Sequence, residues 1–555
     1  MPGVKLKVAF LVGRDDAATR AVIARVCESP HVEPLAVLLD TATDPPGRRW
    51  RNLKRNLRRE GLSYLPHRLA GALREALEAR ADRVIPVQEV EQLLHQAFPD
   101  RSLAKLAARR GFPLFAAGNL NGAEAMKYLR SVDADLGIVL GTRILKRGTF
   151  SIPKQGSINL HKGKVPEYRG MPPGFWELYD GASSAGVTIH FVDDGLDTGD
   201  VLGTAEISIH AKETPESLRR KLDAEGIRLM AGVVEQIALG VAVRRPQPKT
   251  AHPARTRPTR QQTIELARRL PHWRRFSDSR QAVKTAAWLA IYHGGLYTLV
   301  RSLRKGRSRG AILLYHRVND ISEDVLTAST QRFAEHLVTL RHYYRVTATE
   351  GIVEQIGKSA PLESGTVAIH FDDCYRDVRT CAAPLLAAAG APAMAFVSSG
   401  FVDTDRVFCH DQEKYPHRHE NFQSRDLREL PGLGVSVAAH TVNHVDLGAV
   451  SLEQARIEVE ESGRQLEQTI SAPVRMFSFP FGRLDNIREE VRAIVVKAGY
   501  SALFSAHGGF IDENTSLFDI PRIGVSSDHS PLALMMELEG ISPRRLKSLL
   551  LSRRA

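Results

Sequence analysis

The chain has 555 residues, more than one ordinary hydrophobic core supports, and its length predicts roughly three or four domain-sized units. Its apolar content of 43% and charged content of 25% are typical of globular proteins and exclude wholesale disorder. The net charge of +13 suits nucleic acid, an anionic membrane surface or a phosphorylated substrate, and charge alone does not choose among them.

The first half of the chain alternates predicted strands and helices. Residues 5–12 and 35–40 are apolar runs typical of buried strands, and residues 16–26 between them have the pattern of a helix. A further helix is predicted over 123–131, followed by a strand over 134–140. This rhythm indicates an α/β fold in which helices cover a parallel sheet.

A dense group of polar residues follows in the segments Gly156–Gly170 and Gly186–Gly203. Asn159 and His161 are two residues apart, so an extended strand presents both side chains on one face. Asp197 lies in a turn-like segment between two glycines. An amide that stabilises an oxyanion, an imidazole that carries a proton and a carboxylate that fixes its tautomer suit acyl transfer to an amine. The alternative is that the amide and imidazole only satisfy backbone groups at a strand end.

These motifs resemble the formyltransferase family that uses 10-formyltetrahydrofolate, which includes methionyl-tRNA and sugar-amine formyltransferases. The resemblance covers about residues 5–247 and implies a Rossmann-like fold. It implies that Asn159 holds the formyl oxygen, that His161 relays the proton of the amine, and that Asp197 supports His161. It assigns no residues to cofactor binding. The loop at 162–166 departs from the family pattern, and its two lysines suit either a phosphorylated acceptor or solvent.

The composition changes near Pro246. Residues 244–262 are rich in proline, arginine and threonine and too poor in apolar residues to build a core, so they are predicted as a boundary segment. Residues 285–300 are uncharged and apolar but shorter than the run of about 18 residues that spans a bilayer. They are predicted as a packing or amphipathic helix, with attachment to a membrane surface as the alternative.

A second series of strand-like runs begins at residues 311–315. It continues through 366–371, 393–397 and 435–439, with helical segments between them. The repetition predicts a second α/β domain, for which a (β/α) barrel is the expected architecture.

Two strands of this second domain are followed by residues that suit a metal. Asp372 and Asp373 are adjacent, and His440 and His444 are four residues apart, a spacing that can place both imidazoles on one helical face. One carboxylate and two imidazoles hold a divalent metal and leave a position open for water, which the metal activates. The sequence therefore predicts a mononuclear hydrolytic site in which the other carboxylate is the base.

Both motifs resemble those of the polysaccharide deacetylase (NodB-homology) family, over about residues 310–522. By the resemblance, Asp372 is the base, while Asp373, His440 and His444 bind the divalent metal, for which zinc is expected.

Two further roles in this site are less regular. The arginine that orients the base in the family is missing from its usual place, and Arg475 or Arg522 is expected to replace it. The leaving amine needs a general acid. The segment around His316 looks like the circularly permuted subgroup, which implies that His316 is this acid, with a structural role as the alternative and His507 in reserve. His410 is predicted to be a loop residue.

The predicted organisation is a formyltransferase domain over 1–250, a basic linker with a helical segment over 251–309, and a deacetylase-like domain over 310–555. The predicted protein is a bifunctional enzyme of amino-sugar or glycoconjugate modification. It transfers a formyl group to an amine and hydrolyses an N-acetyl or N-formyl amide. The alternatives are that one domain is only a binding module, or that the formyl acceptor is a charged tRNA.

The expected partner is an amino sugar or glycoconjugate, in a nucleotide-linked or lipid-linked form. Nucleic acid is not expected, because the sequence has no RNA-binding signature. The four cysteines form no CxxC pair, which indicates neither a disulfide framework nor a thiolate zinc site. Residues 1–12 lack the pattern of a secretory signal, so a cytoplasmic location is expected, with contact to a membrane surface as the alternative.

Overall fold

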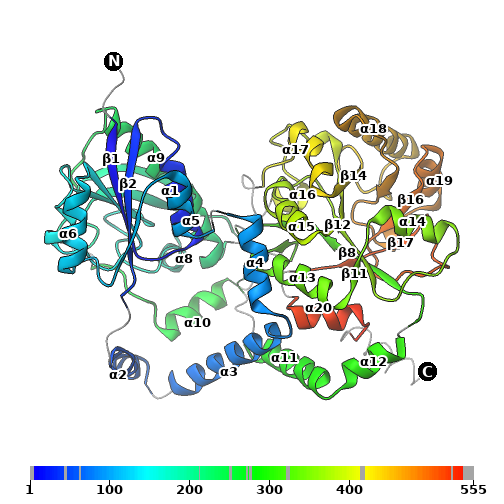
Figure 1. The fold of residues 1–555 in the computed structure, drawn as a ribbon, viewed down its shortest axis with the longest axis horizontal. Coiled ribbons are helices and arrows are strands. Elements are labelled where there is room, and N and C mark those ends of the chain that lie inside the picture. Colours follow the sequence, from blue (N-terminus) through cyan, green and yellow to red (C-terminus); the bar gives the residue numbers. More distant parts are fainter. Residues whose placement is uncertain are drawn as a thin grey trace. The chain divides into compact units, whose positions relative to one another are not determined.

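The chain forms two compact units in the computed structural model (Figure 1). Unit 1 comprises residues 1–69 and 98–275, and unit 2 comprises residues 70–97 and 276–555. The structure describes residues 5–42, 47–61, 64–99, 101–211, 213–248, 253–270, 273, 278–304, 306–320, 325–412, 419–526 and 529–541.

Unit 1 is built on a seven-stranded sheet with the order β3-β2-β1-β4-β5-β6-β7. The strands are β1 (Leu6–Val12), β2 (Val32–Asp40), β3 (Leu114–Ala117), β4 (Leu136–Leu140), β5 (Ser157–His161), β6 (Ser184–Phe191) and β7 (Val201–Ser208). The first five strands are parallel, whereas β6 and β7 pair antiparallel. The helices are α1 (Ala17–Val26), α2 (Arg48–Glu60), α5 (Leu103–Arg110), α6 (Ala123–Val132), α7 (Arg147–Phe150), α8 (Phe175–Asp180), α9 (Pro215–Ala238) and α10 (Arg260–Arg269). This Rossmann-like arrangement confirms the predicted fold class of the first half.

Helices cover both faces of this sheet because β1, an inner strand, is apolar on both faces from Val8 to Val12. Phe10 of β1 packs into the cluster that contains α1 and α9, whereas Leu11 faces the cluster that contains α6. The predicted helix over 16–26 begins at Asp16, whose side chain accepts a hydrogen bond from the backbone of Thr19.

Unit 2 is a nearly closed barrel of parallel strands, with the order β17-β16-β15-β14-β13-β12-β8-β18. The barrel strands are β8 (Gly310–Tyr315), β11 (Arg345–Val346), β12 (Thr366–Phe371), β13 (Ala393–Val397), β14 (Val435–Ala439), β15 (Met476–Ser478), β16 (Ala502–Ser505), β17 (Ile520–Pro521) and β18 (Ile523–Gly524), of which β11 pairs with β12. Two short strands, β9 (Arg317–Val318) and β10 (Thr327–Ala328), pair with each other in a separate sheet. Because β17 pairs with β16 and β18 pairs with β8, the segment 520–524 closes the ring. The predicted barrel is confirmed, and the predicted strands 366–371, 393–397 and 435–439 coincide with β12, β13 and β14.

Helices surround this barrel (Figure 1). They are α4 (Val87–Ala97), α11 (Asp278–His293), α12 (Leu296–Arg304), α13 (Thr330–Tyr343), α14 (Thr349–Gly357), α15 (Ala383–Ala389), α16 (Cys409–Gln412), α17 (Ser424–Glu429), α18 (Leu452–Ile470), α19 (Glu489–Lys497) and α20 (Pro531–Leu538). Short turns of helix are η1 (Val378–Ala382), η2 (Ser399–Phe401), η3 (Pro431–Leu433) and η4 (Leu484–Asn486).

The two units do not follow the predicted domain boundaries. Residues 70–97, which come from α3 (Tyr64–Asp82) and α4, belong to unit 2, and the predicted linker is divided between the units after residue 275. Ala81 of α3 is buried in a cluster with Trp288 and Met535, and the Tyr343 hydroxyl donates a hydrogen bond to the Val84 carbonyl at 2.9 Å. These contacts between distant parts of the chain decide which unit the segment joins.

The apolar run at 285–300 forms parts of two helices. α11 and α12 are separated at Gly294 and Gly295, and Gly295 has a φ of 80°, a conformation that favours glycine. Trp288 and Leu289 of α11 are buried, so the prediction of a packing helix is confirmed for this part. Among the described helices, none has the length and apolar character needed to cross a membrane.

Candidate functional sites

The carboxyl end of β5 and the turn between β6 and β7 bring together three of the predicted site residues. Nδ1 of His161 is 3.4 Å from Oδ2 of Asp197, and the Asn159 amide is 3.3 Å from Nε2 of His190. His190 in turn lies 3.5 Å from Oδ1 of Asp197. His190 was not predicted as a site residue, although it lies on the strand that leads into the Asp197 turn and pairs with Asn159 in the sheet.

The turn that carries Asp197 is held from several sides. Asp197 has a φ of 54°, and its Oδ2 accepts a hydrogen bond from the Gly170 backbone at 3.1 Å. The Gln247 side chain donates to the carbonyls of Asp197 and Gly199, at 3.2 and 2.6 Å. A Cβ on Gly199 would lie 1.9 Å from the Phe191 carbonyl oxygen, so only glycine fits there. The carboxylate therefore has a fixed direction.

The electrostatic setting of unit 1 suits proton transfer by an imidazole. Burial lowers the pKa of His161, and the charge of Asp197 opposes this effect. Burial raises the pKa of Asp197, but the hydrogen bond of His190 and the charge of His161 outweigh it and leave that pKa below its ordinary value. Nε2 of His161 donates to the Tyr168 carbonyl at 2.8 Å, so both ring nitrogens face acceptors. An imidazolium formed during a reaction would be stabilised on both sides.

The two lysines of the loop at 162–166 are engaged in ion pairs. Lys162 contacts Asp223, and Lys164 lies 3.2 Å from Glu206 and donates to the Ser184 hydroxyl at 3.1 Å. Each charge therefore has an acidic neighbour in its own unit.

In unit 2 the predicted residues lie at the carboxyl ends of β12 and β14. The prediction that His440 and His444 share a helical face is wrong, because residues 440–444 form a loop in which Thr441 and His444 have φ values of 63° and 54°. Glu458 of α18 holds this loop by accepting hydrogen bonds from the backbones of Val442 and Asn443. The irregular loop still directs both imidazoles to the same place.

Asp373, His440 and His444 form a group that suits a metal. One ligand atom of each lies within 4.8 Å of the others, and Nε2 of His444 is 3.0 Å from Oδ1 of Asp373. Nδ1 of His440 donates to the Ser478 carbonyl at 2.8 Å, which leaves the Nε2 lone pair available toward Asp373. Oδ2 of Asp373 is buried and has no hydrogen-bond partner among the described residues. A buried carboxylate, the oriented imidazole of His440 and the imidazole of His444 fit a divalent metal such as zinc.

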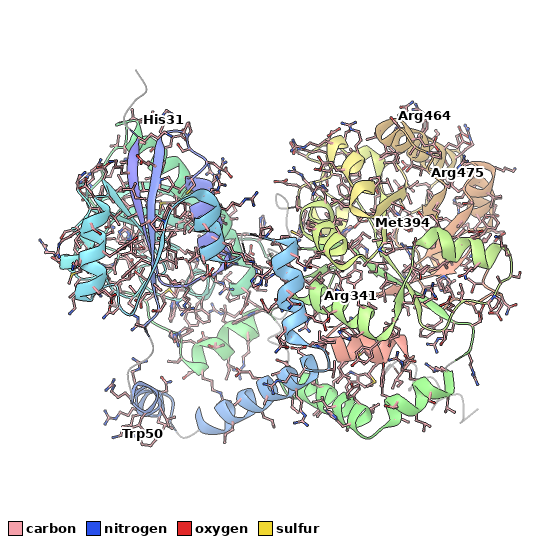
Figure 2. The ribbon with its side chains drawn as sticks, viewed as in Figure 1. His31, Trp50, Arg341, Met394, Arg464 and Arg475 are labelled. Carbon is pink, nitrogen blue, oxygen red and sulfur yellow. The ribbon has the colours of Figure 1, made fainter. Side chains whose placement is uncertain are left out.

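Asp372 lies beside this group, with Oδ2 3.9 Å from Nε2 of His440, but its hydrogen bonds go to other partners. Arg522 donates from Nη1 and Nη2 to the two carboxylate oxygens at 2.7 and 2.8 Å, and the Ser478 hydroxyl is 3.4 Å from Oδ2. Burial raises the pKa of Asp372, but Arg522 and His440 keep it below its ordinary value. Of the two arginines expected here, Arg522 therefore contacts Asp372, whereas Arg475 is exposed (Figure 2).

The histidines considered as acids take different positions. His316 directly follows β8; burial lowers its pKa, and the charges of Asp373 and Asp372 oppose this effect, so it lies near both carboxylates. His507 pairs with Asp519 at 3.0 Å in an exposed position.

His410 is not the simple loop residue that the sequence predicted. It lies in the short helix α16, with Nε2 3.6 Å from Oδ2 of Asp373 and 2.8 Å from the Tyr375 hydroxyl. That hydroxyl donates to Asp411, which forms a buried ion pair with Arg317 at 2.8 Å. No spacing in the sequence links α16 to the Asp-Asp motif, so only the folded barrel shows this neighbour.

Two family models match separate parts of the chain, and the first match begins within residues 70–97 of unit 2. Residues 74–234 match the family model described as formyl transferase, and residues 359–503 match the one described as polysaccharide deacetylase. The methionyl-tRNA formyltransferase of Thermodesulfovibrio yellowstonii is 35% identical over 146 residues, which are 26% of this chain and 47% of that protein. That of Agathobacter rectalis is 34% identical over 142 residues, or 25% and 46%. The chain spans about half the length of these curated relatives.

Two solved structures resemble parts of the chain. A Streptococcus pyogenes deacetylase in complex with acetate is 20% identical, with a TM-score of 0.36, and the match covers 41% of this chain and 98% of that one. Glycinamide ribonucleotide transformylase 1 from Symbiobacterium toebii is 17% identical, with a TM-score of 0.30, and the match covers 44% and 95%. The predicted resemblances are confirmed by the two family models: the chain carries two family domains, one that matches formyl transferase and one that matches polysaccharide deacetylase.

Proposed function

We propose that this protein is a bifunctional enzyme of amino-sugar or glycoconjugate modification. One site transfers a formyl group from 10-formyltetrahydrofolate to an amine, and the other hydrolyses an N-acetyl or N-formyl amide with a divalent metal. The observation that carries the proposal is the separation of roles in unit 2, where Asp372 is clamped by Arg522 while Asp373, His440 and His444 form a metal-binding group.

In unit 2, each residue has a defined task. A divalent metal held by Asp373 and the two histidines would polarise the amide carbonyl and lower the pKa of the attacking water. Asp372, kept ionised by Arg522, accepts the proton of that water. His316, near both carboxylates, donates a proton to the amine nitrogen as it leaves.

In unit 1, the amine nitrogen of the acceptor attacks the formyl carbon, and the bond from that carbon to the folate nitrogen breaks. The Asn159 amide donates a hydrogen bond to the formyl oxygen as negative charge develops on it. His161 takes the proton of the amine, Asp197 at 3.4 Å stabilises the imidazolium, and His161 then gives the proton to the folate nitrogen as it leaves.

A second candidate acceptor is a charged tRNA. Curated relatives of this chain are named methionyl-tRNA formyltransferase, and the net charge of +13 suits a polyanion. The chain covers less than half of those relatives, so this acceptor is tested beside amino sugars.

The test is a mass-spectrometric assay of the full chain, loaded with zinc, on a panel of N-acetylated and free amino sugars. The panel includes nucleotide-linked and lipid-linked forms, with and without 10-formyltetrahydrofolate, and methionyl-tRNA is a separate arm. We expect loss of an acetyl group and, on the freed amine, gain of a formyl group. Asp372→Asn should abolish only the first step, and His161→Ala only the second.

Each contrary result has a distinct meaning. Formylation of methionyl-tRNA but of no amino sugar would replace the proposed acceptor. Activity that survives both Asp372→Asn and His161→Ala would exclude these sites from catalysis. Activity at one site alone, under conditions in which both units are folded, would reduce the second domain to a binding module.

A further inference from the structure

A cavity of about 430 Å³ lies at the end of the unit 2 barrel that is opposite the metal-binding group. Gly310 and Thr366, the first residues of β8 and β12, line it, whereas Asp373 lies just beyond the other end of β12. Its volume is within the range of roughly 300–1,000 Å³ that is usual for small-molecule sites. The cavity is therefore separate from the candidate catalytic site.

The lining of the cavity is strongly positive. It contains the guanidinium groups of Arg301, Arg304 and Arg309 and one carboxylate, that of Glu539. Three positive charges and one negative charge leave a net charge of two positive units in the lining. Arginine presents a planar fork of donors that matches the oxygens of phosphate.

Two of the arginines are held in place by backbone carbonyls and aromatic rings. Arg301 donates to the Tyr343 carbonyl at 2.5 Å, and its guanidinium lies 5.4 Å from the centre of the Tyr343 ring. Arg309 donates to the Leu538 carbonyl at 3.1 Å and lies 3.3 Å from the centre of the Phe510 ring. These contacts fix the directions of both guanidinium groups, and Nη1 of Arg304 lies 3.9 Å from Oε2 of Glu539, so a ligand would meet a preorganised site.

Hydroxyl groups and aromatic surface complete the lining. Thr298 and Ser302 of α12 contribute hydroxyls, and Tyr344 donates to Glu539 at 3.2 Å. The Tyr343 hydroxyl donates to the Val84 carbonyl at 2.9 Å, so Tyr343 contributes its ring and its orientation to the lining. Donors beside apolar rings suit a ligand that combines an anionic group with an organic body.

We propose that this cavity binds a phosphate ester, with the dianionic phosphate between Arg301, Arg304 and Arg309. Either a soluble phosphorylated compound or a phospholipid headgroup can present this group. The outward face of α12 exposes Leu296, Leu299 and Leu303, so the test includes a lipid surface.

The direct test is calorimetric titration of the full chain with inorganic pyrophosphate, against sodium chloride of equal ionic strength. The protein carries Asp373→Asn, so that binding at the metal site does not contribute. We expect one site per chain that Arg304→Gln weakens about ten-fold or more, since one charged contact is lost. Glu539→Gln should instead tighten binding, because it removes the negative charge of the lining and keeps the side-chain size. Arg464→Gln, on the exposed surface of α18 (Figure 2), is the matched control and should change nothing.

Opposite changes of the dissociation constant in Arg304→Gln and Glu539→Gln distinguish a ligand site from arginines that only stabilise the packing of α12. If Arg304→Gln does not fold, the tightening by Glu539→Gln still decides the question. No heat beyond that of chloride, or a dissociation constant that neither variant changes, would overturn the proposal.

Vesicles distinguish the source of the phosphate. Sedimentation with phosphatidylcholine vesicles that contain phosphatidic acid, against phosphatidylcholine alone, measures headgroup binding. Binding to the anionic vesicles that pyrophosphate displaces supports a headgroup as the ligand. Pyrophosphate binding without vesicle binding supports a soluble ester.

Discussion

Arg522 and Asp372 form a bidentate pair, with Nη1 and Nη2 of the arginine 2.7 and 2.8 Å from the two oxygens of the carboxylate. Arg522 lies between β17 and β18, in the segment that closes the barrel, and its Nε donates to the Ser505 carbonyl at 3.0 Å. Closure of the barrel and the direction of the proposed base therefore depend on the same residue.

Replacement of this arginine should affect both properties. We expect Arg522→Met to cost about 3–5 kcal/mol of stability, because a buried carboxylate loses its charged partner. Amide hydrolysis should be lost, while formyl transfer by unit 1 continues. Urea unfolding followed by tryptophan fluorescence measures the first effect, and the mass-spectrometric assay measures the second. The double variant Arg522→Met/Asp372→Asn should recover part of the lost stability. If the single and the double variant lose the same free energy of unfolding, the pairing is contradicted.

Removal of the metal should separate the two activities. We expect a chelator to abolish amide hydrolysis and to leave formyl transfer unchanged. Elemental analysis should find about one zinc per chain, as the one three-ligand group among the described residues predicts. Asp373→Asn should lose the metal, whereas the exposed substitution Arg475→Gln should keep it. If the protein still hydrolyses the amide when elemental analysis finds no metal in it, the predicted site is refuted.

Metal binding should depend on pH through His444. Burial lowers the pKa of this imidazole, but the neighbouring Asp373 outweighs burial and raises it to about 9. A proton therefore competes with the metal for His444, so zinc affinity should rise with pH up to about 9 and binding should release protons. Competition with a chromophoric chelator between pH 6 and 9, on the order of three pH units, measures this slope. An affinity that stays constant over this range would contradict it.

Asp197 should set the protonation of His161. Because the charge of Asp197 raises the pKa of His161 against the effect of burial, Asp197→Asn should move that pKa further down. Formyl transfer should fall by about 100-fold or more, since proton transfer loses its support. NMR titration of the imidazole gives the direction of the shift. Asp193→Asn, in the same turn but hydrogen-bonded to Thr198, is the control and should leave the titration unchanged.

His336 should make unit 2 sensitive to acid. It is fully buried between the Tyr315 hydroxyl and the His529 carbonyl, and burial lowers its pKa from 6.5 to about 3. Between these values the unfolded chain binds the proton and the folded chain does not, so stability falls as the pH falls, by up to about 1.4 kcal/mol per pH unit. His336→Gln should flatten this slope in urea titrations, whereas the exposed His342→Gln should not; the same slope in all three proteins would exclude His336 as its source.

The packing of residues 70–97 on unit 2 can be tested by calorimetry. Ala81→Asp places a charge in the cluster with Trp288 and Met535, so we expect the thermal transition of unit 2 to move down by several degrees. The midpoint temperature of the unit 1 transition should not change. That transition is assigned by the effects on it of a folate ligand and of His161→Ala. Leu73→Asp is the control, because that side chain is 61% exposed. A shift of the unit 1 transition alone would assign the segment to unit 1.

Local pattern predicted most of the strands and the core of each site. The run TVAIHF is apolar or β-favouring at every position except His370 and forms β12 over the predicted range, because both faces of a barrel strand are covered. Asn159 and His161 are close in the chain, as are Asp372 and Asp373. Their local motifs were therefore enough to predict that each pair lies at the end of one strand.

The sequence by itself determined the two α/β units, the two families they match and the residues of both motifs, because these depend on neighbours along the chain. Only the tertiary structure decided that Arg522 and not Arg475 holds Asp372, that His410 lies beside Asp373, and that residues 70–97 join unit 2. Each of these contacts joins residues that are far apart in the chain. Periodicity and local propensity carry no information about such pairs, which form only when the barrel closes and buries its polar groups against one another.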